Sequence, residues 1–127
     1  MRALVALLAA LALAACGGRA YWPPVEAPAR GTSAEGIASW YGPKYHGRPT
    51  ASGEIFNMDE LTAAHAYWAF GTKVRVTLVA NGRSVVVRIN DRFPGYKGRI
   101  IDLSRAAAEA IGLIGPGTGR VRLEIVE

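Results

Sequence analysis

The sequence has little of what many catalytic centres are built from. Its 127 residues include one cysteine, Cys16, so no disulfide can form within the chain. The two histidines, His46 and His65, have no partners at the spacing of a zinc site, and the chain has neither a Gly-x-Ser-x-Gly nucleophile motif nor a phosphate-binding P-loop. We therefore expect no metal ion and no cofactor.

Dense clusters of charge are also missing. The 15 Lys and Arg residues outnumber the 10 Asp and Glu residues, which gives a net charge of +5, but no run of five or six basic residues occurs. Recognition of nucleic acid needs a clustered basic stripe, so no nucleic-acid partner is expected. A diffuse basic surface suits a polyanion such as the cell wall or lipid headgroups, and it serves solubility equally well.

The apolar run at the amino terminus is shorter than the roughly 20 residues that cross a bilayer. Residues 3–12 follow Arg2 and are typical of a secretory signal. The run ends in Leu-Ala-Ala-Cys, which resembles the lipobox of bacterial lipoproteins, where the cysteine is acylated and the chain is cut before it. We expect a signal peptide over residues 1–15 and a lipid on Cys16, with an ordinary signal peptide as the alternative. Gly17 favours, by analogy, an outer-membrane anchor facing the periplasm.

Residues 16–34 are expected to form a linker, because they combine three prolines with Gly, Ala and Ser and show no apolar period. Proline-rich chain is extended and holds a domain away from its anchor. The remaining residues, 35–127, are enough for one modest hydrophobic core.

Alternating polar and apolar residues predict a domain of mainly β structure. The turn at Asn81-Gly82 is a strong hairpin signal between two such segments. We expect strands over residues 36–41, 73–78, 83–90, 99–101 and 120–126. Ser104 predicts a helix that ends at Gly112, and Asn57 with Glu60 resembles a capping box that starts a second helix toward His65. Two short helices are too few for a doubly wound sheet, so a small β-barrel is favoured.

Four titratable residues stand beside these elements and are candidates for chemistry: Glu54, His65, Asp91 and Asp102. Asp102 lies between isoleucine and leucine, a setting that predicts a raised pKa, because desolvation disfavours the charged carboxylate. Each candidate also has a structural alternative. Asp102 suits the amino terminus of a helix, Asp91 an ion pair with a nearby arginine, Glu54 a solvated turn and His65 a satisfied helix end.

Six short blocks follow one another along the domain: Ala38–Gly42, Thr50–Glu54, Leu61–His65, Phe70–Thr72, Val87–Arg92 and Gly98–Ser104. They resemble the rare lipoprotein A (RlpA) family and come in that family's order. The resemblance implies a six-stranded double-psi β-barrel with one or two short helices, a fold shared with expansins and with MltA-type lytic transglycosylases. It also implies an endolytic transglycosylase that cleaves peptidoglycan between N-acetylmuramic acid and N-acetylglucosamine, favours peptide-poor strands and leaves 1,6-anhydro ends.

The same resemblance implies roles for individual residues. Asp91 matches the family's Asn-Asp-Arg aspartate and is expected to be the acid, while Asp102 is its rival. Glu54 and His65 are expected to position groups and stabilise charge. The residues expected to bind substrate are Tyr41, Tyr45, Ser52 and Arg92.

Two departures from the family pattern are visible. Trp68-Ala69 stands where Leu-Pro is usual, and Phe93 replaces a glycine in the loop beside the proposed acid. The family's frequent C-terminal peptidoglycan-binding SPOR domain has no match, so septal targeting through it is not expected. The expected partners are glycan strands, a membrane through Cys16 and proteins of the division machinery, with the chain acting as a monomer. Two other functions stay open: a non-catalytic, expansin-like wall-binding module, and an inactive envelope protein that binds protein partners.

Overall fold

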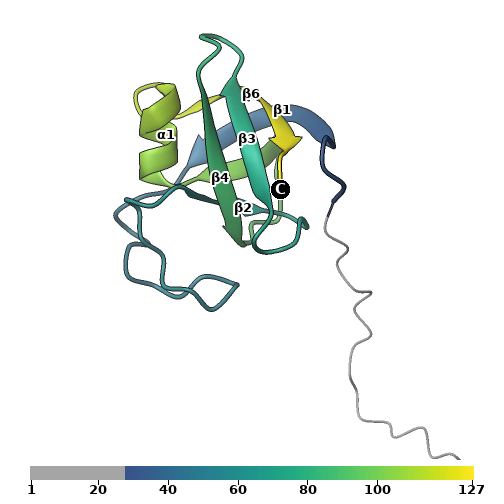
Figure 1. Cartoon of the computed structure of the whole chain (residues 1–127). Coiled ribbons are helices and arrows are strands. Elements are labelled where there is room, and N and C mark those ends of the chain that lie inside the picture. Colours follow the sequence, from purple (N-terminus) through teal and green to yellow (C-terminus); the bar gives the residue numbers. More distant parts are fainter. Residues whose placement is uncertain (1–27) are drawn as a thin grey trace, which may run out of the picture.

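Alternation along two neighbouring strands sets the architecture. Every second side chain of β3 (Lys73–Leu78) and β6 (Thr118–Ile125) is buried, as period-2 geometry requires of a strand with one apolar face. The computed structural model describes residues 28–127, in which six strands close into a barrel in the order β1-β5-β2-β4-β3-β6 (Figure 1). The other elements are β1 (Ser33–Trp40), β2 (Thr62–His65), β4 (Ser84–Asp91), β5 (Arg99–Leu103) and α1 (Arg105–Ile111). The predicted six-stranded double-psi barrel is confirmed, with one helix.

Several predictions fall on residues before 28. The signal peptide over residues 1–15, the lipid on Cys16 and the linker as far as residue 27 lie outside the described residues. The first strand begins at Ser33, inside the end of the predicted linker. Over the described part of the chain, no helix is both long and apolar enough to cross a membrane.

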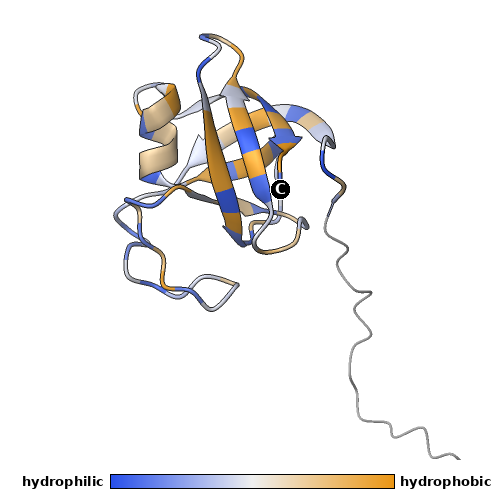
Figure 2. Ribbon diagram, in the orientation of Figure 1, coloured by the Kyte–Doolittle hydropathy of each residue, from blue (hydrophilic) through white to orange (hydrophobic). Residues whose placement is uncertain are grey.

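The barrel core consists of aliphatic side chains that strands β3, β4 and β6 direct inward. Val74, Val87, Val121, Leu123 and Ile125 are each at most 1% exposed. Figure 2 shows the corresponding apolar bands on the strands. Burying one such side chain stabilises the fold by about 1.5–3 kcal/mol.

Helix α1 closes the core from outside the barrel (Figure 1). Its buried residues are Ala107, Ala108 and Ile111, which share one face of the helix. Both predicted caps are confirmed: the Ser104 side chain accepts a hydrogen bond from the Ala107 N–H, and Gly112 ends the helix in the left-handed conformation with φ 79°.

The helix predicted to start at Asn57 is absent, and this prediction was wrong. Asn57 Oδ1 accepts a hydrogen bond from the Asp59 N–H at 2.9 Å, which closes a local turn rather than capping a helix. The chain then enters β2, which lies between β4 and β5. All four residues of β2 are buried, so burial on both faces hides the alternation that would have identified a strand.

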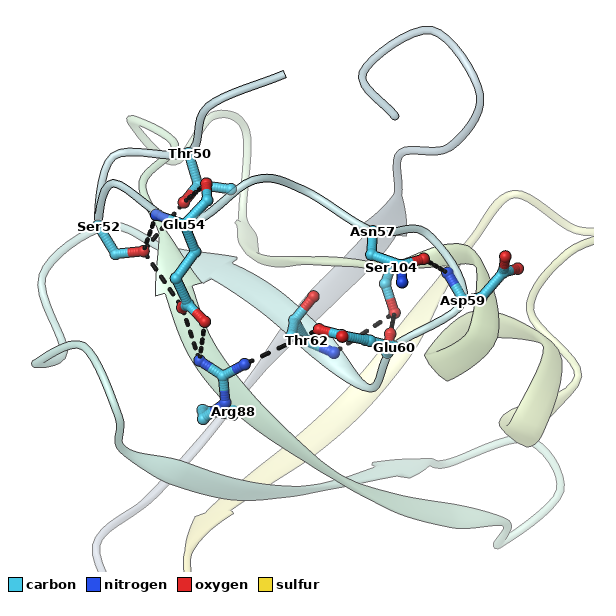
Figure 3. Close-up of polar contacts among 9 residues, drawn as sticks. All are labelled: Thr50, Ser52, Glu54, Asn57, Asp59, Glu60, Thr62, Arg88 and Ser104. Carbon is cyan, nitrogen blue, oxygen red and sulfur yellow. Dashed lines mark hydrogen bonds and ion pairs between the residues drawn. The ribbon is translucent and has the colours of Figure 1, made fainter. Parts of the chain in front are cut away.

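Ser104 joins α1 to the chain before β2. Its Oγ donates to the Glu60 carbonyl at 2.6 Å and accepts from the Thr62 N–H (Figure 3). The same Oγ accepts from the Ala107 N–H.

We predict that Ser104→Ala lowers the free energy of unfolding by about 1–2 kcal/mol, because buried backbone groups lose their partner. Urea unfolding measures this, with Ser84→Ala at an exposed position as the control. Equal stability of the two variants would contradict the assigned role.

Candidate functional site

A β-bulge in β4 turns Asp91 out of the barrel. Ile89 pairs with Ala63 and Asp91 pairs with Ala64, so Asn90 is an extra residue in the pairing. Without the bulge, Asp91 would point to the same side as Ile89, into the apolar core. The bulge moves its carboxylate to the outer face instead.

A second bulge, in β5, brings a cation to Asp102. Arg99 pairs with Ile37 and Ile101 pairs with Ala38, so Ile100 is the extra residue. Residues three apart on a regular strand point to opposite faces, and the bulge cancels this difference. Arg99 Nη2 therefore lies 3.8 Å from Asp102 Oδ1.

These pairings line up four residues across four adjacent strands. Ser39 pairs with Asp102, Asp102 with Ala64, and Ala64 with Asp91. Two strand spacings separate the aspartates, which puts their Cα atoms roughly 10 Å apart, and the small Ala64 side chain lies between them. A cleft of about 190 Å³ opens over this row. Its lining residues are Tyr41, Tyr45, Ala64, Asp91, Arg92, Phe93 and Asp102.

Asp102 is partly buried, with 18% of its side chain exposed. Burial raises its pKa, opposed by a 2.8 Å hydrogen bond from Ser39 Oγ and by the charge of Arg99. The negative charge of Asp91 acts in the same direction as burial. The raised pKa expected from the apolar sequence neighbours is thus confirmed, with burial as its largest cause.

Asp91 is held by backbone groups. Its Oδ1 accepts hydrogen bonds from the N–H groups of Ala51 and Arg92, both at 2.9 Å. Ser52 N–H also donates to the Asn90 carbonyl, so the loop before β2 is hydrogen-bonded to the end of β4. Within residues 28–127, Asp91 forms no ion pair, so the alternative of an arginine salt bridge is not observed.

Tyr41 carries an unusual hydroxyl. Its Oη is buried and has no hydrogen-bond partner in the described part of the chain. The ring is fixed by stacking on Phe56 at 4.4 Å and by edge contact with Tyr45 at 5.8 Å. Burial raises its pKa, as do the charges of Asp91 and Asp102 and an interaction with the Asp91 carboxylate that falls short of hydrogen-bond geometry, so the phenol stays protonated inside the cleft. Unsatisfied buried groups are rare and often mark function.

Glu54 lies outside the cleft lining and supports the loop that reaches Asp91. Its carboxylate accepts from Arg88 Nη1 at 2.6 and 2.8 Å, and Ser52 Oγ donates to it at 3.3 Å (Figure 3). The hydrogen bond from Arg88 lowers the pKa of Glu54. Glu54 and Ser52 therefore stabilise the loop that reaches Asp91, and they do not line the cleft themselves.

His65 is on strand β2 rather than at a helix end. Its Nδ1 accepts hydrogen bonds from the Tyr67 and Trp68 N–H groups, and its ring stacks on Trp68 at 4.0 Å. Burial lowers its pKa to about 4, helped by the charge of Arg92. The ring is therefore neutral near pH 7.

The turn held by His65 positions Arg92. Arg92 Nη1 donates to the Trp68 carbonyl at 2.6 Å and to the His65 carbonyl at 3.3 Å, and the guanidinium lies 4.0 Å over the Phe70 ring. This fixes a cation on the wall of the cleft, next in sequence to Asp91.

The cleft brings together five of the predicted residues: Asp91, Asp102, Tyr41, Tyr45 and Arg92. It leaves out Glu54, Ser52 and His65. Sequence reasoning did not single out Ser39, which belongs to the block Ala38–Gly42 and which the strand register places against Asp102. Phe93, the departure from the family pattern, forms part of the cleft wall. Among the described residues, no three His, Cys, Asp or Glu side chains gather as a metal site.

The fold of this domain is similar to that of solved structures of known class. The Streptomyces papain inhibitor superposes with a TM-score of 0.66 over 80% of this chain and 100% of that structure, at 22% identity. An expansin from Clavibacter michiganensis superposes with a TM-score of 0.61 over 76% of this chain and 51% of that structure, at 24% identity. The domain is thus a double-psi β-barrel, here with two aspartates in its cleft.

Comparison of the sequence with known proteins identifies the family within this fold class. The family described as lytic transglycolase matches residues 33–123. A Synechocystis sp. protein named "Probable endolytic peptidoglycan transglycosylase RlpA" is 62% identical over 92 residues, 72% of this chain and 29% of that protein. The Campylobacter jejuni "Endolytic peptidoglycan transglycosylase RlpA" is 50% identical over 109 residues, 86% of this chain and 39% of that protein. The chain belongs to the RlpA family. It spans less than two fifths of the length of these relatives.

The unpaired Tyr41 hydroxyl predicts an unusual stability result. Because a buried hydroxyl without a partner costs free energy, Tyr41→Phe should leave the free energy of unfolding unchanged or raise it by up to about 1 kcal/mol. Urea unfolding measures the change, and Tyr45→Phe, at an exposed ring, is the matched control. A loss of more than about 1 kcal/mol in Tyr41→Phe alone would show that the hydroxyl has a structural partner.

His65 predicts a defined pH dependence of stability. Its pKa falls from 6.5 to about 4 on folding, so the unfolded chain binds the proton more readily between these values. Stability should therefore be complete above about pH 6.5 and decline toward pH 4, by at most roughly 3 kcal/mol. His65→Gln should flatten this slope in chemical unfolding measured across the range, whereas His46→Gln should preserve it. An unchanged slope in His65→Gln would refute the assignment.

Proposed function

We propose that this domain is an endolytic peptidoglycan lytic transglycosylase that cleaves between N-acetylmuramic acid and N-acetylglucosamine. The observation that carries the proposal is the row Ser39, Asp102, Ala64 and Asp91, which sets two carboxyl groups on one wall of a cleft. Paired carboxyls flanking a glycosidic bond are the usual equipment for its cleavage. The names of the curated relatives support the same activity.

We assign the proton donor to Asp102. The resemblance favoured Asp91, but burial raises the pKa of Asp102, and an acid catalyst must hold its proton near neutral pH. Asp91, fixed by two backbone N–H groups, is then the carboxylate that stabilises positive charge on the sugar ring. Both residues therefore keep catalytic roles.

The reaction follows from this assignment. Asp102 gives its proton to the bridging oxygen as the bond from that oxygen to C1 of the muramic acid breaks, and the Asp91 carboxylate lies beside the developing oxocarbenium ion. The C6 hydroxyl oxygen of the same sugar then bonds to C1, and its proton passes to Asp102. The acid is restored, no water is consumed, and the product carries a 1,6-anhydro ring.

The walls of the cleft suit a sugar chain. Tyr41, Tyr45 and Phe93 supply aromatic surface on which sugar rings pack, and Arg92 supplies a donor held in a fixed direction. Tyr41 Oη is a further donor within the site. These groups support binding of peptide-poor glycan strands.

We also propose that the domain works in the cell envelope, anchored by a lipid on Cys16. A signal peptide over residues 1–15 would direct it to the outer membrane, and a spacer from Cys16 to the start of β1 at Ser33 would hold it toward the wall. Acylation supports anchoring only where more than one chain is attached, as in bacterial lipoproteins.

The test uses the purified protein with peptide-stripped glycan strands and with intact sacculi. Mass spectrometry should detect 1,6-anhydro-muramic ends with the wild type. Asp102→Asn should slow their formation by about 100-fold or more, because it removes the acid. Asp91→Asn should slow the reaction. The pH profile of this variant should still show activity falling as the acid loses its proton. Asp59→Asn, in an exposed turn outside the cleft, is the control.

Two results would change the conclusion. Full activity in Asp102→Asn, with loss in Asp91→Asn, would return the acid to Asp91. Absence of anhydro ends from wild-type protein that still sediments with glycan would indicate a binding module, with the Phe93 loop as the first place to examine.

A further inference from the structure

Arg99 has no part in the reaction described above, yet it lies at the edge of the cleft. Its Nη2 donates a hydrogen bond to Ser39 Oγ and lies 3.8 Å from Asp102 Oδ1. Its guanidinium carbon lies 5.9 Å from the centre of the Phe93 ring, close enough for a cation–π contact. Asp102 and Phe93 both line the cleft, so Arg99 contacts the lining without being part of it.

The Ser39 hydroxyl joins Arg99 to the acid. A guanidinium only donates hydrogen bonds, so Ser39 Oγ is the acceptor in its bond with Arg99. The single hydrogen of the hydroxyl is then directed at Asp102 Oδ1, 2.8 Å away. Ser39 is 5% exposed, and its Oγ has no third partner within residues 28–127. Turning the hydrogen elsewhere would therefore leave it buried and unpaired.

This arrangement makes Oδ1 the acceptor oxygen of the Asp102 carboxyl group. Oδ1 receives the Ser39 hydrogen and faces the Arg99 cation, and both favour negative charge on that atom. Oδ2 forms no hydrogen bond with any residue that the structure describes. When Asp102 is protonated, the proton therefore lies on Oδ2, the oxygen that is left free for a ligand in the cleft.

The groups that face Asp102 leave Arg99 as its one ion-pair partner in the described part of the chain. Its neighbours in the strand pairing are Ser39 on β1 and an uncharged alanine on β2. The carboxylate of Asp91 on β4 and the phenol of Tyr41 also face it, and neither carries positive charge.

The groups that face Arg99 likewise leave Asp102 as its counter-ion. Arg99 also lines a separate cavity of about 200 Å³. Among the other residues of that lining, His65 is neutral near pH 7 and Tyr67 presents a phenol, so no carboxylate there competes for the guanidinium. Arg92, the cation of the cleft wall, donates instead to backbone carbonyls of the segment after β2.

We propose that Arg99 is a positioning residue for the acid: by fixing the direction of the Ser39 hydroxyl, it keeps the transferable proton on Asp102 Oδ2, the oxygen open to the cleft. The inference rests on the proposed function, because it concerns the acid assigned there. Arg99 does not line the cleft, so it acts through Ser39 and Asp102. An acid whose proton settled on either oxygen would present the wrong one to the glycosidic bond for part of the time.

The first test needs no substrate, so its failure is distinct from failure of the proposed reaction. The pKa of Asp102 is measured by carbon NMR of its carboxyl group in wild type, Ser39→Ala, Arg99→Met and the double variant. Ser39→Ala should raise this pKa when Arg99 is present, because the carboxylate loses a donor. In Arg99→Met the hydroxyl is free to accept from the protonated acid instead, so Ser39→Ala should raise the pKa much less.

Two further variants sharpen this measurement. Arg99→Lys keeps a cation that can donate to Ser39 and should restore the larger effect of Ser39→Ala. Arg75→Met, which removes a strand arginine paired with Glu124, is the matched control and should leave the pKa of Asp102 unchanged. Equal rises of the pKa with and without Arg99, or no rise in either background, would overturn the proposal.

The second test measures the formation of 1,6-anhydro ends from glycan strands across a range of pH. The limiting kcat, extrapolated to fully protonated acid, should fall by about tenfold or more in Arg99→Met while KM changes less than about twofold, because the proton is misplaced and the cleft lining is kept. A limiting kcat equal to that of wild type would overturn the proposal. Wild-type protein that forms no anhydro ends would instead contradict the proposed function, and the pKa measurements would still decide the role of Arg99.

Discussion

The site depends on the pairing of β2 between β4 and β5. This four-residue strand is bonded on both sides, and each neighbour carries a bulge near the pairing, at Asn90 in β4 and at Ile100 in β5. One bulge directs Asp91 outward and the other brings Arg99 to the side of Asp102. Ala64, the residue that pairs with both aspartates, is small enough to leave a cleft between them. A bulge disrupts local pairing, and its place next to a site is typical of its use to aim a side chain.

The buried polar groups of the cleft lower the stability of the fold. Asp102 is buried beside a serine and an arginine, and Tyr41 buries a hydroxyl that no described residue accepts. Each arrangement costs free energy that an apolar core would not. Both become useful if a substrate supplies the missing partner, because an enclosed acid and an unpaired donor gain most when a ligand arrives.

Residues that do not line the cleft hold its polar side chains in place. Glu54 and Arg88 fasten the loop whose Ala51 N–H binds Asp91. His65 stabilises a turn in which its own carbonyl and that of Trp68 accept hydrogen bonds from Arg92. The importance that the family resemblance implies for Glu54 and His65 thus has a physical basis in the loop and the turn that they stabilise, and neither residue lines the cleft.

The amino-acid sequence by itself determined the strands with one buried face, the Asn-Gly hairpin and the cap of α1, because alternation and capping are local properties. It also determined the family and most of the cleft residues, because their motifs are short and specific. Only the tertiary structure decided that Thr62–His65 is a strand, since a segment buried on both faces loses its alternation. It alone decided that Asp91 faces the cleft, because period-2 counting from Val87 and Ile89 would place it in the core. Ser39 and Arg99 join Asp102 through pairing register and a bulge, which are relations between distant segments that no local pattern encodes.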